Sequence, residues 1–167
     1  MDHEASTVER TTIVGISEMA VSDDPNELLV TYSLGSCLGL ALYDTNLHIG
    51  GIVHCMLPSS SLEPGSMDQQ PAKYVDSGVP ALLTALFKAG ATRRGLVAKV
   101  AGCASSMDGK SIFHIGERNY AMLRKVLWKN DILIGAEDIG GMRPRTLFLA
   151  IETGMTYIRS GDREREL

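Results

Sequence analysis

Short strand-like runs separated by turn residues are the feature that most restricts how this chain can fold. Such runs occupy residues 11–21, 28–34, 38–44, 48–57, 96–101, 132–139, 146–151 and 155–159. Proline, glycine, aspartate and asparagine interrupt them, as in the DDPNE segment and the Asp44-Thr45-Asn46 turn. This pattern is typical of β-strands and predicts roughly seven to nine of them. We expect the first four to complete an antiparallel meander.

Two segments have helical spacing instead. The first starts at Ala72, ends near Gly90 and carries Pro80 near its first turn or at a kink. The second presents an apolar face formed by Tyr120, Leu123, Val126 and Leu127. Apolar residues at intervals of three and four positions indicate amphipathic helices that pack on a core. The two helices must therefore cover one sheet or two, which predicts an α/β fold with a mixed, largely antiparallel sheet.

The length and charge of the chain limit its class. A chain of 167 residues is most simply one domain, which we expect at residues 12–159. We expect a flexible leader at residues 1–11 and a flexible tail at residues 160–167, which is frayed and solvated. The formal net charge is −4 and no run of Lys and Arg occurs, which argues against a nucleic-acid partner. No apolar run approaches the roughly 18 residues of a membrane helix, so we expect no membrane insertion.

The start of the chain and its cysteines indicate the compartment. The stretch MDHEASTVERTT is polar and acidic, unlike a secretory signal. The three cysteines, Cys37, Cys55 and Cys103, are an odd number, which argues for reduced thiols rather than a disulfide framework. We therefore expect a cytoplasmic protein.

Cys37 lies in a Gly-Ser-Cys turn between two strand-like runs, in the stretch SLGSCLGLALYD. A cysteine that only packs in a core needs no such turn, although a buried small residue at a strand start is the alternative interpretation. Gly35 and Ser36 are small enough to let a substrate approach, and backbone N–H groups at a turn can bind a carbonyl oxygen. The turn therefore suits a nucleophilic thiol beside an oxyanion hole.

A nucleophilic thiol with an ordinary pKa of about 8.5 needs a base. His54 is the best placed histidine, because antiparallel pairing of its strand with the Cys37 strand would bring the two together; a hydrogen-bonded core histidine is an equal alternative. Thr31, on the strand that leads into the turn, can orient the imidazole through its hydroxyl, or can be an ordinary β-branched strand residue. Cys55 points to the opposite face from His54 and is assigned to the core.

A zinc site built from the three cysteines and His54 is the metal alternative. The chain contains no Cys-x-x-Cys pair and no His-x-x-x-His pair, which are spacings typical of such sites. We therefore expect no metal.

A long loop rich in serine and proline occupies residues 58–71. Loops of this length in compact domains often serve function. We predict that Leu62 to Gln70 helps to form the rim of a shallow groove that admits a helix.

Six blocks stand out in order and spacing: LGSCLGLALYD, GGIVHCMLP, AKYVDSGVPALL, AKVAGCA, IGERN and AEDIGG. Together they resemble the chemoreceptor glutamine deamidase family, CheD, over a span from about Thr12 to Arg159. The resemblance implies a three-layer α/β sandwich, distantly like bacterial toxins that deamidate glutamine. It also implies a protein-glutamine glutaminase, which is an amidohydrolase, and a place in bacterial chemotaxis.

The resemblance assigns roles to residues of this chain. In the family the cysteine of the LGSC block is the nucleophile, the histidine of the GGxxHxMLP block is the base, and a threonine six positions before the cysteine completes the site. The matching residues are Cys37, His54 and Thr31, with Gly35 and Ser36 beside the bound carbonyl group. No cofactor is implied. Gly102-Cys103 stands where the family often has Gly-Gly, so the role of Cys103 is open.

The resemblance also implies partners. The substrate would be a glutamine on the cytoplasmic helices of a methyl-accepting chemoreceptor, and a second partner would be a CheC-type phosphatase. An alternative function is a chemotaxis adaptor that binds and modulates such a phosphatase, with catalysis secondary. A transglutaminase that passes the same thioester to an amine is also left open.

Overall fold

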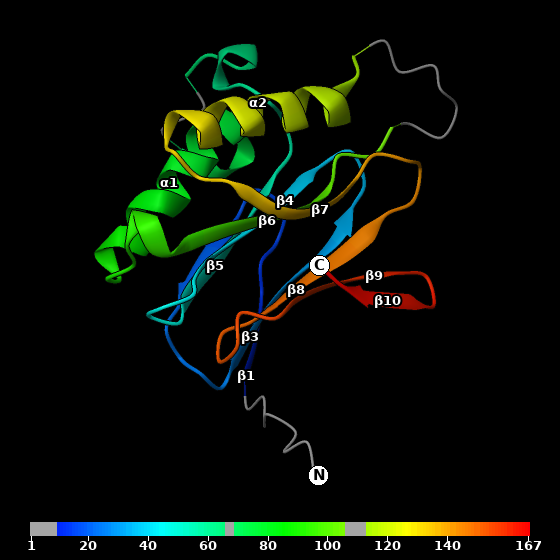
Figure 1. Ribbon diagram of the computed structural model, residues 1–167. Coiled ribbons are helices and arrows are strands. Elements are labelled where there is room, and N and C mark those ends of the chain that lie inside the picture. The colour runs from blue at the N-terminus through cyan, green and yellow to red at the C-terminus, as the bar shows by residue number, and fades with distance from the viewer. Residues whose placement is uncertain (1–9, 66–68, 106–112) are drawn as a thin grey trace.

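The structure, a computed structural model, describes residues 10–65, 69–105 and 113–167. These residues form two five-stranded sheets and a layer of two α-helices (Figure 1). Sheet A has the strand order β1-β3-β8-β9-β10, and sheet B has the order β2-β5-β4-β6-β7. The expected three-layer α/β sandwich is thus confirmed.

The bounds of the elements are as follows. Sheet A contains β1 (Arg10–Ile13), β3 (Glu27–Leu34), β8 (Arg145–Ala150), β9 (Thr156–Ser160) and β10 (Arg163–Glu166). Sheet B contains β2 (Met19–Ser22), β5 (Ile49–Cys55), β4 (Leu38–Asp44), β6 (Leu96–Gly102) and β7 (Ile134–Ile139). The helices are α1 (Val75–Lys88), which contains Pro80, and α2 (Ile115–Lys129). Only the β1–β3 and β6–β7 pairs are parallel among the strand pairs of the described residues, so the sheets are mixed and largely antiparallel, as predicted.

The predicted meander is wrong, because the chain crosses between the sheets three times near its start. Residues 11–21 form two strands rather than one: β1 joins sheet A and β2 joins sheet B, with Ser17 at a φ of 62° between them. β3 then pairs with β1 and β8 in sheet A, whereas β4 and β5 pair in sheet B. The turn at residues 35–37 is therefore a crossover between sheets and not a hairpin. Local patterning does not specify which sheet a strand will join.

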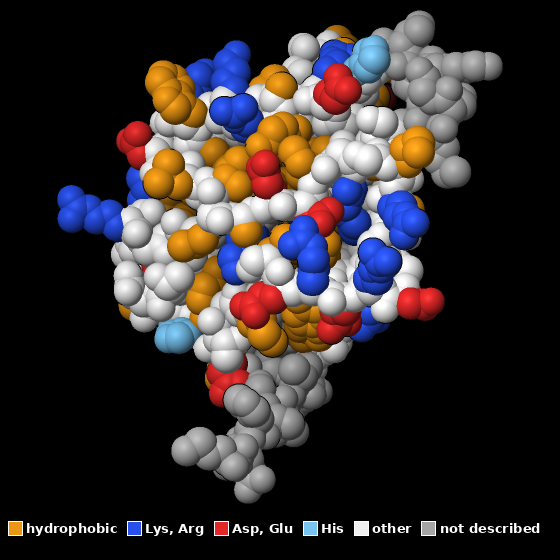
Figure 2. All heavy atoms as spheres, turned by 45° about the vertical axis from the view of Figure 1, so that its right-hand side comes forward, with side chains coloured by type: hydrophobic (Ala, Val, Ile, Leu, Met, Phe, Trp, Pro, Cys, Tyr) orange, Lys and Arg blue, Asp and Glu red, His pale blue; other side chains and the backbone are white. Residues whose placement is uncertain are grey.

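The end of the chain also differs from expectation. Arg163–Glu166, where a frayed tail was predicted, form β10, which pairs antiparallel with β9. Asp138 of β7 forms ion pairs with Arg145 of β8 and Arg165 of β10, so charged groups join sheet B to sheet A. Figure 2 shows Lys and Arg side chains interspersed with Asp and Glu on the face that it presents.

The core has two parts because sheet B is covered on both faces. Between the sheets lie Leu29, Leu34, Ala41, Ile52 and Leu147, among others. Between sheet B and the helices lie Leu40, Val53, Leu82, Leu86 and Leu123, among others. Because successive strand residues point to opposite faces, Gly39 and His54 face the space between the sheets and Cys55 faces the helices.

Close packing of the two sheets at Gly39 leads to a prediction. A Cβ atom at this position would lie 2.6 Å from Leu34 Cδ1 and 3.3 Å from Leu147 Cδ2, both in fully buried side chains. Gly39→Ala should lower the free energy of unfolding by about 1–3 kcal/mol through overpacking, measured by urea denaturation. Gly35→Ala is the control, because a Cβ atom there meets nothing within 4 Å. Equal losses in the two variants would contradict the prediction.

Candidate active site

The candidate residues come together where the chain crosses between the sheets. Thr31 lies on β3 of sheet A, His54 lies on β5 of sheet B, and Cys37 ends the crossover that joins β3 to β4. The register pairs Gly39 with His54, which confirms the predicted antiparallel pairing of the two strands. Alternation along β4 places Cys37 on the same face as Gly39, and Cys37 packs against the cluster between the sheets. The thiol and the imidazole therefore share one face of sheet B.

A hydrogen bond between Thr31 and His54 fixes the tautomer of the imidazole. Thr31 Oγ1 lies 2.7 Å from His54 Nδ1 and donates to the Val14 carbonyl oxygen at 2.7 Å. A hydroxyl group has one hydrogen, so Thr31 accepts from the Nδ1–H group of His54. The neutral ring then carries its lone pair on Nε2. This atom is buried and has no hydrogen-bond partner among the described residues.

The main chain of His54 is held by the crossover between β1 and β2. The His54 N–H donates to the Glu18 carbonyl oxygen at 3.0 Å, and the His54 carbonyl oxygen accepts from the Ser17 N–H at 3.0 Å. Val14, which binds Thr31, belongs to the same segment between β1 and β2. The β1–β2 crossover therefore contributes to the position of the imidazole, both directly and through Thr31.

Burial sets the charge states of the thiol and the imidazole. It lowers the pKa of His54 to about 4 and raises the pKa of Cys37 above that of a free thiol. At neutral pH the imidazole and the thiol are both uncharged. The site therefore holds a neutral thiol and a neutral imidazole, rather than a preformed pair of thiolate and imidazolium.

In the crossover between β3 and β4, the backbone carbonyl groups have hydrogen-bond partners in other described residues, whereas two of the N–H groups do not. The three carbonyl oxygens of residues 35–37 all accept bonds from the protein; their donors, in order, are the Ala104 N–H (2.9 Å), the Asn119 side chain (3.0 Å) and the Cys103 N–H (2.8 Å). The N–H groups of Ser36 and Cys37 donate to no other residue in the described parts of the chain, and the Cys37 N–H faces its own thiol. They are available to bind a carbonyl oxygen beside the thiol, as an oxyanion hole requires.

Sequence reasoning missed Asn119, although the residue belongs to the IGERN block. Its side chain is fully buried, and Nδ2 donates both to the Ser36 carbonyl oxygen and to the Met56 carbonyl oxygen. A signal was present in the sequence. Asn119 stands four positions before Leu123, on the predicted apolar face of its helix, where a polar residue needs a partner.

The other cysteines lie in the core. Cys55 and Cys103 are buried in the cluster between sheet B and the helices, which confirms the core assignment of Cys55. Burial raises the pKa of both thiols, that of Cys103 to about 12. Cys103 has a φ of 51°, in the region that favours glycine. In the part of the chain that the structure describes, no group of three or more His, Cys, Asp and Glu residues could hold a metal ion.

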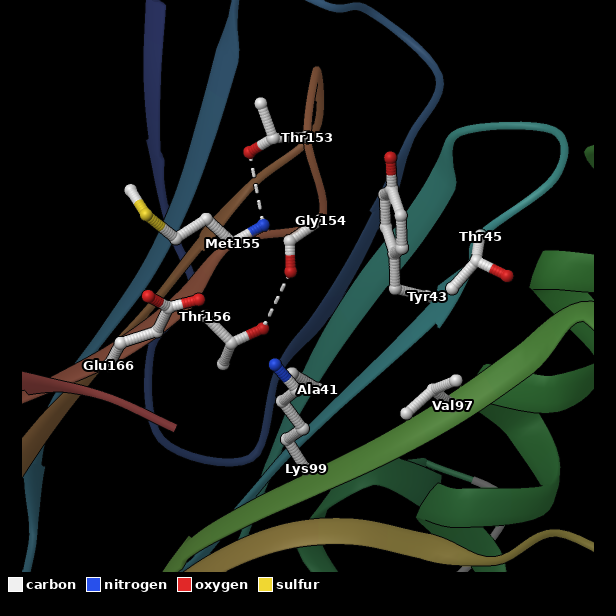
Figure 3. A pocket seen from close by; sticks show the side chains of 10 residues that line it. All are labelled: Ala41, Tyr43, Thr45, Val97, Lys99, Thr153, Gly154, Met155, Thr156 and Glu166. Carbon is white, nitrogen blue, oxygen red and sulfur yellow. Dashed lines mark hydrogen bonds between the residues drawn. The ribbon is translucent and has the colours of Figure 1, made fainter.

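A pocket of about 490 Å³ between the sheets lies apart from these residues (Figure 3). It is lined from sheet B by Ala41, Tyr43 and Lys99 and on the opposite side by residues 153–156 and Glu166. Ala41 lies at the centre of β4, and Tyr43 lies near the end of β4 that is distant from Cys37. None of the candidate residues lines this pocket.

The predicted rim at Leu62 to Gln70 is described only in part, because residues 66–68 lie outside the described residues. Ser60–Leu62 form a short 3₁₀ helix, and Asp76 near the start of α1 accepts bonds from the Ser60 N–H. These contacts attach the start of the loop to α1. A role at the rim stays a prediction.

Comparisons with known proteins show the family. A family model described as CheD chemotactic sensory transduction matches residues 56–160. A probable chemoreceptor glutamine deamidase CheD of Solibacter usitatus is 43% identical over 155 residues, which cover 93% of this chain and 92% of that protein. The chain belongs to the CheD family. Proteins with the same description from Syntrophus aciditrophicus and Symbiobacterium thermophilum are 43% and 44% identical, over 93% and 95% of this chain and 98% of each relative.

The family model covers less of the chain than the relatives do. The CheD family model begins at residue 56, so it includes Asn119 but neither Cys37 nor His54. Among solved structures, a Neisseria meningitidis protein of the DUF152 family has a TM-score of 0.48 at 10% identity, over 79% of this chain and 63% of that chain. No helix in the described residues is long and apolar enough to span a membrane.

The buried imidazole of this CheD family member should titrate at low pH. Because burial lowers the pKa of His54 to about 4, an NMR titration of its ring should have a midpoint near pH 4. The unfolded chain, with a pKa near 6.5, binds the proton more readily than the folded chain. The free energy of unfolding should therefore fall as the pH decreases from 6.5 toward 4, and His54→Gln should reduce this dependence. A midpoint near 6.5 in the folded protein would contradict the prediction.

Proposed function

We propose that this chain hydrolyses the side-chain amides of specific glutamines in methyl-accepting chemoreceptors, giving glutamate and ammonia. The family supports this activity, because its relatives are named probable chemoreceptor glutamine deamidases. The geometric observation that supports it best is the combination of a partly buried thiol, a neutral imidazole with an unpartnered Nε2 and two backbone N–H groups that donate to no other described residue. The reaction takes place in the cytoplasm, on receptor helices that present the glutamine at the surface.

The first half of the proposed reaction forms a thioester. The Cys37 sulfur attacks the side-chain amide carbon of the glutamine as Nε2 of His54 accepts the thiol proton. The amide oxygen becomes an oxyanion, which the N–H groups of Ser36 and Cys37 bind. The C–N bond then breaks, and His54 returns the proton to the departing nitrogen, which leaves as ammonia.

The second half hydrolyses the thioester. His54 accepts a proton from a water molecule, whose oxygen attacks the same carbon atom and gives a second oxyanion in the same place. The C–S bond breaks, the Cys37 sulfur regains a proton from His54, and the product is a glutamate side chain. Thr31 keeps Nδ1 protonated throughout, so Nε2 is the atom that exchanges protons in both halves.

The product changes the charge of the receptor. A neutral amide becomes a carboxylate, which adds repulsion between neighbouring acidic groups on a helical bundle and provides an oxygen that a methyltransferase can esterify. A CheC-type phosphatase is a further proposed partner of this chain, on the basis of the family resemblance.

The nucleophile is tested by Cys37→Ala. The purified protein is incubated with a receptor cytoplasmic fragment, and mass spectrometry is used to detect conversion of glutamine to glutamate. Wild type should produce the acid and Cys37→Ala should produce none, because no sulfur remains to form the thioester. If the two proteins gave equal spectra and still bound a CheC-type phosphatase, the deamidase function would be refuted and the adaptor function supported. Addition of a primary amine tests whether the thioester is also captured as a transglutaminase product.

Gly35 provides a test of the space beside the thiol. A Cβ atom at Gly35 would meet nothing within 4 Å, so Gly35→Val should fold with an unchanged melting temperature. Its side chain would occupy the region through which the substrate carbonyl approaches, and kcat/KM should fall by at least about 10-fold through misplacement of the amide. A fully active Gly35→Val variant would contradict the proposed position of the substrate.

A further inference from the structure

Asn119 connects the two segments that carry the proposed nucleophile and base. Its Nδ2 atom lies 3.0 Å from the Ser36 carbonyl oxygen and 3.1 Å from the Met56 carbonyl oxygen. Ser36 directly precedes the nucleophile, and Met56 is two residues beyond His54. The β4–β5 ladder ends at the Leu38–Cys55 pair. Asn119 therefore bridges the segment before β4 and the segment after β5, just beyond the point where the backbone pairing of these strands stops.

The bond to Ser36 determines where the next N–H group points. In a trans peptide, the carbonyl oxygen and the amide hydrogen lie in the same plane and point in opposite directions, on either side of the C–N bond. When Asn119 holds the Ser36 carbonyl group toward α2, the N–H group of Cys37 in that peptide must point away from α2. This N–H group is one of the two that donate to no other described residue, and it faces its own thiol. It belongs to the nucleophilic residue itself, so it lies beside the thiol.

Packing alone does not account for an asparagine at this position. The residue is fully buried, and its Oδ1 atom has no hydrogen-bond partner in the described parts of the chain. A buried carbonyl oxygen without a donor lowers the stability of the fold. Two carbonyl oxygens require a donor here, and a carboxamide has two hydrogens on a single nitrogen that can satisfy both. The chemistry of the side chain thus matches the two acceptors that it bridges.

We propose that Asn119 is a positioning residue that aligns the oxyanion hole of Cys37 by fixing the plane of the Ser36–Cys37 peptide. The inference rests on the proposed deamidase function, because the oxyanion exists only in that reaction. It assigns a role to the IGERN block that involves no contact with the substrate. Loss of Asn119 should reduce stabilisation of the transition state more than binding of the receptor.

The first experiment replaces Asn119 with Leu, an apolar side chain of similar size, and measures deamidation of a receptor cytoplasmic fragment. We expect kcat to fall on the order of 10- to 100-fold, and KM to change less than about threefold. The loss of kcat should not exceed that typical for removal of an oxyanion-hole donor, because the donor itself is retained. The matched control is Asn130→Leu. Asn130 caps the other end of α2, where its Nδ2 donates to the Val126 carbonyl oxygen at 2.8 Å. This control should keep the wild-type kcat.

A second measurement separates alignment of the hole from general damage to the site. Iodoacetamide alkylates a thiol by displacing iodide from a saturated carbon, so no oxyanion forms. Cys37 is the partly buried cysteine, and peptide mapping distinguishes it from Cys55 and Cys103. In Asn119→Leu the rate of Cys37 alkylation should stay within about threefold of wild type while kcat falls, since the thiol and its base are retained. A purely structural role would change both rates together.

The outcomes are distinct. A wild-type kcat in Asn119→Leu, or equal losses of kcat and alkylation rate, would overturn the inference. If this variant does not fold, Asn119→Ser retains one hydroxyl donor in a smaller side chain, and the same selective loss of kcat is expected. Retained deamidation in Cys37→Ala would refute the proposed function itself. Loss of activity in Cys37→Ala together with a fully active Asn119→Leu would refute only the role of Asn119.

Discussion

The hydrogen bond between Thr31 and His54 is the contact on which the candidate site depends, because it joins the two sheets of the sandwich. A buried imidazole needs a partner for its N–H group, and the threonine of the opposite sheet supplies it. The register of β5 is equally necessary. A slip of one residue would exchange the faces of His54 and Cys55 and turn the imidazole toward the helices. Packing of the sandwich and orientation of the base are therefore specified together.

The parts of the fold that were predicted are those determined by neighbouring residues. The pairing of β4 with β5 follows from two apolar runs joined by the short Asp44-Thr45-Asn46 turn, and the spacing of apolar residues in α2 gives its buried face. The crossovers could not be predicted in this way. A strand that leaves Leu34 can enter the same sheet or the next, and the choice depends on β8, which follows more than 100 residues later and pairs with β3.

The candidate site shows the same division between local and long-range information. The residue pattern indicated Cys37, His54 and Thr31 as candidates, the resemblance assigned their roles, and the structure places the last two in hydrogen-bond contact. Asn119 was missed because its meaning depends on the path of the crossover. A polar residue on an apolar helix face indicates a buried partner, but only the packing of α2 against the ends of β4 and β5 shows that the partners are the Ser36 and Met56 carbonyl groups.

The electrostatics of the proposed site make the backbone N–H groups as important as the base. Burial keeps both Cys37 and His54 uncharged, so transfer of the thiol proton alone would create two buried charges at a high cost. Attack on an amide moves the negative charge from sulfur to the substrate oxygen as the proton moves. The charge then lies where the N–H groups of Ser36 and Cys37 can bind it. Proton transfer and carbon–sulfur bond formation are therefore coupled in the attack on an amide, which requires that the amide carbonyl group occupies the hole.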